Sequence, residues 1–229
     1  MSDSTYHRVS LAVFAATVAL LLYAFYQVFF IVPTEVKMGV VQRIFYIHMP
    51  SAVVSFNLFF VVCIASIGYL KTRRLAWDSV AVAAAEVGTV FCATVLITGP
   101  IWAKPVWGSW WAWDPRLTTT LILFLIFVGY LMLRLYVEDR NRRALLSAVV
   151  GIIGFADVPI VYMANRFRGQ HPAPVLGGGE GSGLAPEMLT TLLWSLAALH
   201  ALGLLLFLQR YRLEQMRTEV NELYRALRA

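Results

Sequence analysis

Six long apolar runs constrain the fold of this chain more than any other feature of its sequence. They cover residues 9–32, 44–70, 79–103, 117–133, 144–165 and 188–209. A helix needs about 20 predominantly apolar residues to cross the hydrocarbon core of a bilayer, and each run is of that order. The sequence therefore predicts an all-α polytopic membrane protein. We expect a bundle of six transmembrane helices that forms one domain over residues 1–209.

The distribution of charge predicts how the bundle is oriented. Hydrophobic residues make up 59% of the chain and charged residues only 14%, which leaves no water-soluble domain, and residues 210–229 read as a charged C-terminal helix. Most of the 19 lysines and arginines flank the runs on the side that carries both termini, so the positive-inside rule predicts cytoplasmic termini. The net charge of +6 thus follows from topology and does not indicate nucleic-acid binding.

Tryptophan is concentrated in one predicted outer loop, residues 100–118. Five of the seven tryptophans lie between Trp102 and Trp113, and residues 107–118 read WGSWWAWDPRLT. Each indole carries a large apolar area and a single N–H donor. Interfacial tryptophans often only anchor a helix bundle, but this density favours a surface for a flat apolar ligand. Asp114 and Pro115 also match the N-cap and first position of the helix that follows.

Two histidines fall on the same predicted outer face as the tryptophans. His48 lies at the outer start of the second run and His171 in the loop at 165–187, whereas His7 and His200 fall on the cytoplasmic side. Neutral imidazole is a common axial ligand of haem iron. A hydrogen-bonding role at the interface is the alternative for either histidine.

Basic residues on the same face match the two propionates of a haem. Guanidinium groups pair well with carboxylates because their N–H donors form a planar fork. The candidates are Arg43, Lys104, Arg116 and Arg168.

Two acids and two cysteines lie inside the apolar runs. Glu86 and Asp157 are candidates for a function because burying a charge in a membrane is costly. The interpretation favoured here is that they are neutral or paired with hydroxyl side chains, although Asp157 could instead orient a histidine. Cys63 and Cys92 are expected to be packing residues and not a disulfide.

The C-terminal helix carries an apolar seam. It repeats at alternating spacings of three and four residues and consists of Leu213, Met216, Val220, Leu223 and Leu227. Such a seam is typical of helix packing. It indicates either a solvated extension of the sixth helix or a docking surface for a partner subunit or the membrane.

The segment 107–118 resembles the tryptophan-rich "WWD" signature of a family of haem-handling proteins, and more closely that of its CcmC branch in cytochrome c maturation. Residues 42–52, which include His48, resemble the segment that carries the first outer histidine of that branch. The number of spans and the predicted orientation agree with it over nearly the whole chain.

The resemblance implies a haem chaperone and not an enzyme. It assigns the axial ligands of haem b to His48 and His171, on the periplasmic face of the bacterial inner membrane. The other haem-binding residues expected are Trp107, Trp110, Trp111, Trp113, Asp114, Arg43 and Arg116.

The resemblance also implies partners. The haem would pass to a membrane-anchored acceptor, CcmE. An ATP-driven complex of CcmA and CcmB would then release the loaded acceptor, and the small membrane subunit CcmD would stabilise the assembly.

Three other functions are compatible with the sequence. A b-type cytochrome for electron transfer would need ligands within the bundle, and His200 is the histidine best placed there. A haem translocator would need a path through the bilayer, and the runs hold few polar groups for one. A scaffold with interfacial tryptophans would not retain haem.

Overall fold

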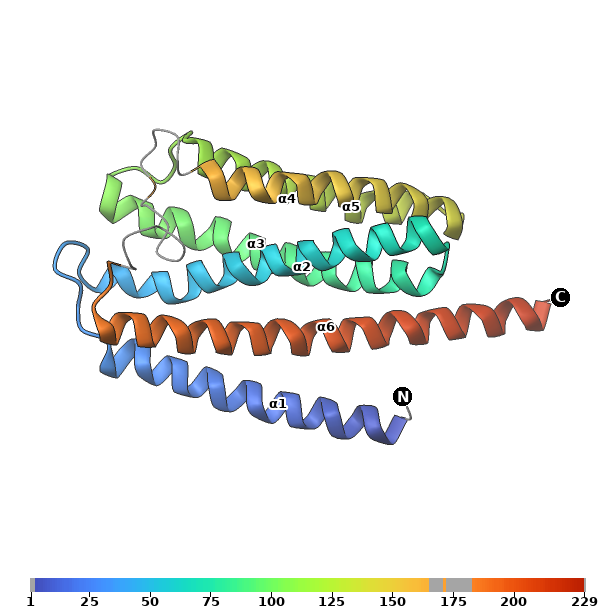
Figure 1. Cartoon of the computed structure of the whole chain (residues 1–229), viewed down its shortest axis with the longest axis horizontal. Helices are drawn as coiled ribbons and strands as arrows, with labels where there is room; N and C mark the ends of the chain where they lie inside the picture. Colours follow the sequence, from blue (N-terminus) through green and yellow to red (C-terminus); the bar gives the residue numbers. More distant parts are fainter. Residues whose placement is uncertain (1–2, 165–170, 172–182, 229) are drawn as a thin grey trace.

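Six long helices make up most of the computed structural model (Figure 1), which describes residues 3–164, 171 and 183–228. They are α1 (Asp3–Tyr26), α2 (Phe45–Thr72), α3 (Leu75–Trp107), α4 (Pro115–Tyr136), α5 (Arg140–Met163) and α6 (Pro186–Arg228). A π-helical turn (Gln27–Ile31) extends α1, and a 3-10 turn (Val40–Ile44) leads into α2. Each helix holds a window long and apolar enough to cross a membrane. The prediction of a six-span all-α membrane protein is confirmed.

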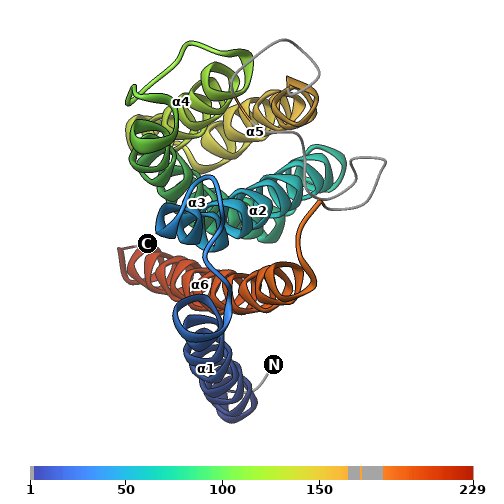
Figure 2. The same cartoon turned by 90° about the vertical axis from the view of Figure 1, so that its left-hand side faces the viewer.

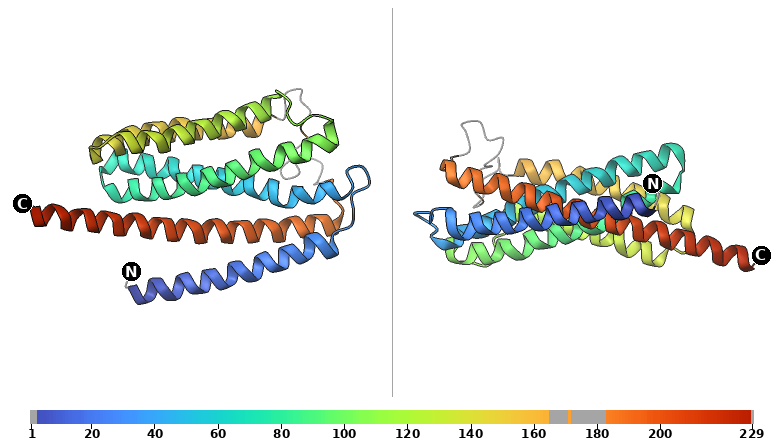
Figure 3. Two further views of the ribbon diagram at one scale, coloured as in Figure 1. Left: turned by 180° about the vertical axis from the view of Figure 1, so that it is seen from behind. Right: turned by 90° about the horizontal axis from the view of Figure 1, so that it is seen from below.

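The helices form a four-helix group with two further helices on one side of it. Figure 1 shows α4 and α5 above α2 and α3, with α6 below them and α1 outermost. α1 packs mainly against α6, and α6 packs against α2 and α3. The view in Figure 2 confirms that α1 lies at the edge of the bundle. Both termini lie at one end, and the connections between α1 and α2 and between α3 and α4 lie at the other (Figure 3).

Small residues let the central helices approach closely. The rings of Phe59 and Phe127 stack at the centre with their centroids 3.6 Å apart. A Cβ added to Gly88 would lie 2.8 Å from Phe59, and one added to Gly154 would lie 3.0 Å from Phe127. Close backbone contact through small residues is the usual way in which transmembrane helices pack. The core is therefore dense between α2, α3, α4 and α5.

Acidic residues within the spans pair with arginines on neighbouring helices. Asp78 receives two hydrogen bonds from Arg134, at 2.6 and 2.9 Å. Glu86 pairs with Arg210, which also contacts Glu214 at 3.0 Å. The expectation that Glu86 is neutral or bonded to a hydroxyl is therefore wrong, because α6 brings a guanidinium beside it.

Asp157 and the cysteines show no such pairing. Asp157 is buried on α5, and its Oδ2 atom has no hydrogen-bond partner among the described residues. Cys63 and Cys92 are buried and free, as predicted.

Helices α3 and α6 both extend beyond the apolar runs from which they were predicted. The tryptophan-rich loop is shorter than the predicted 100–118, because α3 continues through Pro100 and Pro105 to Trp107 and α4 begins at Pro115. Proline is tolerated in membrane-spanning helices where neighbouring groups satisfy the freed backbone. At the other end, α6 runs without a break to Arg228. The apolar seam on its last part is exposed throughout, from Met216 at 47% to Leu227 at 83%.

Candidate functional site

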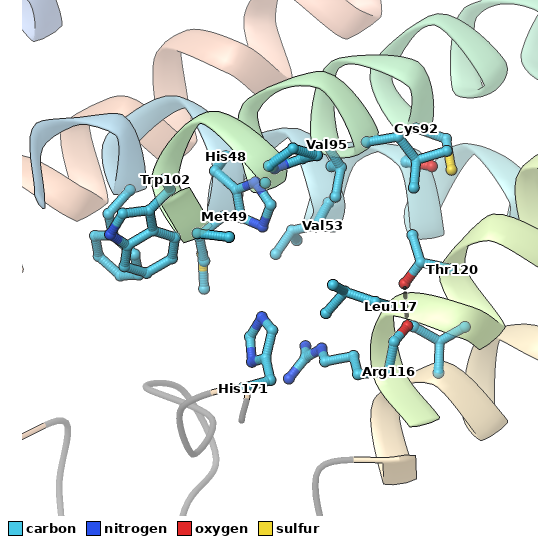
Figure 4. A pocket seen from close by; sticks show the side chains of 18 of the residues that line it. His48, Met49, Val53, Cys92, Val95, Trp102, Arg116, Leu117, Thr120 and His171 are labelled. Atoms are coloured by element: carbon cyan, nitrogen blue, oxygen red, sulfur yellow. Dashed lines mark hydrogen bonds between the residues drawn. The ribbon is translucent and has the colours of Figure 1, made fainter. Parts of the chain in front are cut away.

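A cavity lies at the end of the bundle opposite the two termini. It has a volume of about 490 Å³ and is lined by residues of α2, α3, α4 and α5, by Met38 and Gln42 before α2, and by His171 and Leu184. This volume lies in the range of pockets that bind small molecules and cofactors. Its lining is predominantly apolar and aromatic, with a few polar groups from different helices. Figure 4 shows the polar side chains pointing into the space from opposite sides.

His48 reaches the cavity from the first turn of α2 and is held by α3. Its Nδ1 atom lies 2.9 Å from Oγ1 of Thr98. The ring meets Trp102 edge to face, with the centroids 5.9 Å apart. A Cβ added to Gly99 would lie 3.4 Å from His48 Cε1, so the helix backbone also passes close to the imidazole. Three residues on one face of α3 therefore fix the orientation of this ring.

His171 reaches the same cavity from the connection between α5 and α6. Its ring lies edge to face with that of Trp107, with the centroids 6.5 Å apart. Figure 4 shows the imidazoles of His48 and His171 on opposite sides of the cavity, with the guanidinium of Arg116 beside His171. The sequence singled out His48 and His171, which are 123 positions apart in the chain. These two histidines thus line one cavity.

The tryptophans divide into two groups. Trp107 and Trp111 line the cavity, and so does Trp102, which the sequence analysis did not include among the site residues. Trp110 and Trp113 do not line it and are 59% and 77% exposed. Trp113 instead meets Trp111 edge to face, with the ring centroids 5.8 Å apart. The loop therefore contributes part of its indole surface to the cavity and leaves the rest exposed.

Asp114 shapes the start of α4 and does not line the cavity. Its carboxylate accepts a hydrogen bond of 2.8 Å from the backbone N–H of Leu117, and Pro115 occupies the first turn. This is the N-cap that the sequence predicted. The cap fixes where α4 begins, and Arg116 enters the cavity from that first turn. Asp114 thus acts on the site through the position of Arg116.

Two of the other predicted cations, Arg43 and Lys104, do not line the cavity. Arg43 does not line it, and its guanidinium lies over the ring of Phe29, 5.9 Å from the centroid. Lys104 donates a hydrogen bond of 2.9 Å to the carbonyl of Gly108, where the backbone takes a φ of 77° and α3 ends. Arg168 lies outside the described residues. Arg116 is therefore the predicted propionate partner that the described structure brings to the site.

The contacts of His48 on α3 were not found from the sequence. Thr98 and Gly99 share a helical face with Trp102 because they precede it by four and three residues. That spacing is visible in the sequence, but it indicates a shared helical face only if α3 continues beyond Pro100. The signal was hidden by the expectation that a loop begins there.

His200 has a structural role within the bundle. Its Nδ1 atom lies 2.7 Å from the carbonyl oxygen of Leu196, so Nδ1 carries the proton and donates it. Its Nε2 atom lies 3.0 Å from the amide nitrogen of Asn57, which donates in turn. Both ring nitrogens are therefore engaged, Nδ1 within α6 and Nε2 in the bond that joins α6 to α2.

Fold and site together define an integral membrane protein of six spans with two imidazoles in an aromatic cavity at one end. The model of the family Heme exporter protein C (CcmC) matches residues 2–226. The chain is 37% identical to Heme exporter protein C of Bradyrhizobium diazoefficiens over 211 residues, which covers 91% of this chain and 80% of the relative. It is also similar to the proteins of that name from Paracoccus denitrificans (35% identity, 85% and 81% covered) and Escherichia coli K12 (32%, 83% and 79%). This chain belongs to the Heme exporter protein C family.

Proposed function

We propose that this protein holds haem b as cargo in the cavity, between His48 and His171, on the periplasmic face of the inner membrane. The observation that carries the proposal is that imidazoles from two distant segments line one aromatic cavity. The relatives are named as heme exporters, which agrees with a haem-handling role in cytochrome c maturation. The chain would act as a chaperone that works with an ATP-driven complex.

The donor set fits a metal that already sits in a macrocycle. No group of three or more His, Cys, Asp or Glu that could hold a bare metal ion occurs among residues 3–164, 171 and 183–228. A haem iron needs only axial ligands from the protein, and two imidazoles supply both. Trp102, Trp107 and Trp111 would cover the apolar faces of the ring, and Arg116 would pair with a propionate.

The partners follow from the role of a chaperone. Trp110 and Trp113 lie exposed beside the cavity, where an acceptor that takes up the haem would approach. We infer that the acceptor is a membrane-anchored protein of the CcmE type, and that CcmA, CcmB and CcmD complete the assembly. A b-type cytochrome is the weaker alternative, because both nitrogens of His200 are already engaged in hydrogen bonds.

The test of the ligands is a visible spectrum of the purified protein. We expect a six-coordinate, bis-imidazole haem spectrum for the wild type, with weaker binding in His48→Ala and His171→Ala. His7→Ala is the matched control, because His7 is exposed on α1 at the opposite end of the bundle. Unchanged haem binding in the double variant of His48 and His171 would refute the ligand assignment.

The orientation is tested with single cysteines at exposed sites. Val36 is 97% exposed at the cavity end and Leu227 is 83% exposed near the C-terminus, whereas both native cysteines are buried. A membrane-impermeant maleimide added to intact spheroplasts should label Val36→Cys. It should label Leu227→Cys only after the membrane is opened. The reverse pattern would place the cavity in the cytoplasm and end the proposal.

A further inference from the structure

We infer that Thr98 is a positioning residue that fixes His48 as the Nδ1–H tautomer and so presents its Nε2 lone pair to the cargo iron. This inference rests on the proposed function and adds a residue that acts through the ligand. The starting point is the contact between Nδ1 of His48 and Oγ1 of Thr98 at 2.9 Å.

The hydroxyl proton of Thr98 already has an acceptor. Thr98 Oγ1 donates to the carbonyl oxygen of Thr94 at 2.7 Å, with a second carbonyl, that of Val95, at 3.4 Å. A hydroxyl has one proton to donate and two lone pairs that accept. Back-bonding to the carbonyl four residues earlier is common for threonine in membrane helices. Toward His48, Thr98 is therefore the acceptor, and Nδ1 carries the proton.

The tautomer determines which nitrogen binds a metal. In a neutral imidazole one nitrogen donates and the other keeps a lone pair. Since Nδ1 faces α3, Nε2 lies on the far side of the ring, and Figure 4 shows the ring of His48 directed into the cavity toward His171. Trp102 and Gly99 limit the rotation of the ring. The hydrogen bond to Thr98 thus determines which ring nitrogen of His48 carries the proton, and packing against Trp102 and Gly99 determines the orientation of the ring.

A hydrogen bond of this kind changes the ligand as well as its orientation. Donation from the second nitrogen of a metal-bound histidine raises the basicity of the ligand, and losing the partner typically costs roughly 10- to 100-fold in metal affinity. A more basic imidazole stabilises ferric over ferrous iron. Removing the acceptor should therefore weaken haem binding and raise the midpoint potential of the bound haem.

The test compares Thr98→Val, which keeps the shape and loses the hydroxyl, with Thr98→Ser, which restores it. Thr94→Val is the matched control, because Thr94 lies one turn away on the same helix and its hydroxyl donates to Val90 at 3.0 Å. We expect haem affinity to fall roughly 10- to 100-fold in Thr98→Val, with a higher midpoint potential. Thr98→Ser and Thr94→Val should behave like the wild type.

A second readout needs no haem. With ¹⁵N-labelled histidine, the apo protein has only four histidines to assign, and the His48→Ala variant identifies the signals of that ring. We expect a protonated Nδ1 and an unprotonated Nε2 for His48 in the wild type, and a mixed tautomer in Thr98→Val. Circular dichroism confirms that the variants remain folded.

The outcomes separate the two proposals. A wild-type protein that binds no haem would refute the proposed function, whatever the tautomer. A wild type that binds haem, together with a Thr98→Val variant of equal affinity, potential and tautomer, would refute only the role of Thr98. Equal losses in Thr94→Val, or no recovery in Thr98→Ser, would also overturn that role, since either would show a general effect on the helix.

Discussion

The ion pair between Asp78 and Arg134 gives the stability prediction with the best-defined magnitude. It joins the beginning of α3 to the end of α4, at the end of the bundle away from the cavity, through bonds of 2.6 and 2.9 Å. The two side chains are only 9% and 8% exposed. Removing one partner of a buried pair leaves an uncompensated charge and typically costs about 3–5 kcal/mol. We expect Asp78→Asn to lower the free energy of unfolding by that amount.

The two single variants should differ. A guanidinium cannot lose its proton, whereas a carboxyl group left alone can become neutral by taking one up. Asp78→Asn should therefore be the more damaging change, and Arg134→Met the milder one. Replacing both residues removes the buried charge altogether, which is often neutral for stability. The double variant should recover at least half of the loss in Asp78→Asn.

The assay is equilibrium unfolding in mixed micelles, followed by far-UV circular dichroism. The cavity-lining residues Thr120 on α4 and Cys92 on α3 each lie 14 positions from the pair, which puts the pair about 20 Å from the cavity. We therefore expect the folded fraction of each variant to keep its full haem stoichiometry. If the losses of the two single variants simply add in the double variant, the pair is not coupled and the reasoning fails. Loss of haem from the folded fraction would show that the two ends of the bundle are not independent.

Three further predictions concern the surroundings of the cavity. Gly99→Val should weaken haem binding in a haem titration while Gly99→Ala is tolerated, because an added Cβ would lie 3.4 Å from His48 Cε1, an ordinary contact, and branching beyond it would displace the ring. Trp102→Ala should lower haem retention during size-exclusion chromatography, since it removes the edge contact to His48, and normal retention would exclude this role. His200→Ala should lower stability by about 1 kcal/mol through loss of the bond to Asn57 and leave the haem spectrum unchanged.

The fold could be predicted from the sequence because the bilayer imposes a length and a composition on each helix. The six spans and the cap at Asp114 depend on patterns that are local in the chain. The loop boundary at residue 100 was wrong because α3 continues through Pro100 and Pro105 to Trp107. Proline breaks helices in water but is tolerated in membrane-spanning helices. The error hid the last part of α3, up to Trp107.

The candidate site was predicted in part. Sorting the charges by topology placed His48, His171 and Trp111 on one face, and these residues do line one cavity. The same reasoning could not separate Trp111 from its neighbour Trp110, because successive residues in a loop have no fixed periodicity. It could not place Arg43 either, whose contact is with Phe29. Whether the side chain of a loop residue faces the cavity depends on tertiary contacts.

One rule describes the polar side chains inside the spans, and it applies both to the stability of the bundle and to the candidate site. An unpaired polar group is costly in a membrane, so such residues tend to meet a partner on another helix. Pairs of this kind in the described residues include Asp78–Arg134, Glu86–Arg210, Asn57–His200 and His48–Thr98. The first two pairs are ion pairs between helices. In the third pair Asn57 engages Nε2 of His200, and the carbonyl oxygen of Leu196 engages Nδ1. In His48–Thr98 the bond uses only one nitrogen of the imidazole, and the other nitrogen faces an open cavity. A metal ligand needs one ring nitrogen free at the wall of such a cavity, and this difference from His200 supports the proposal that His48, and not His200, binds haem.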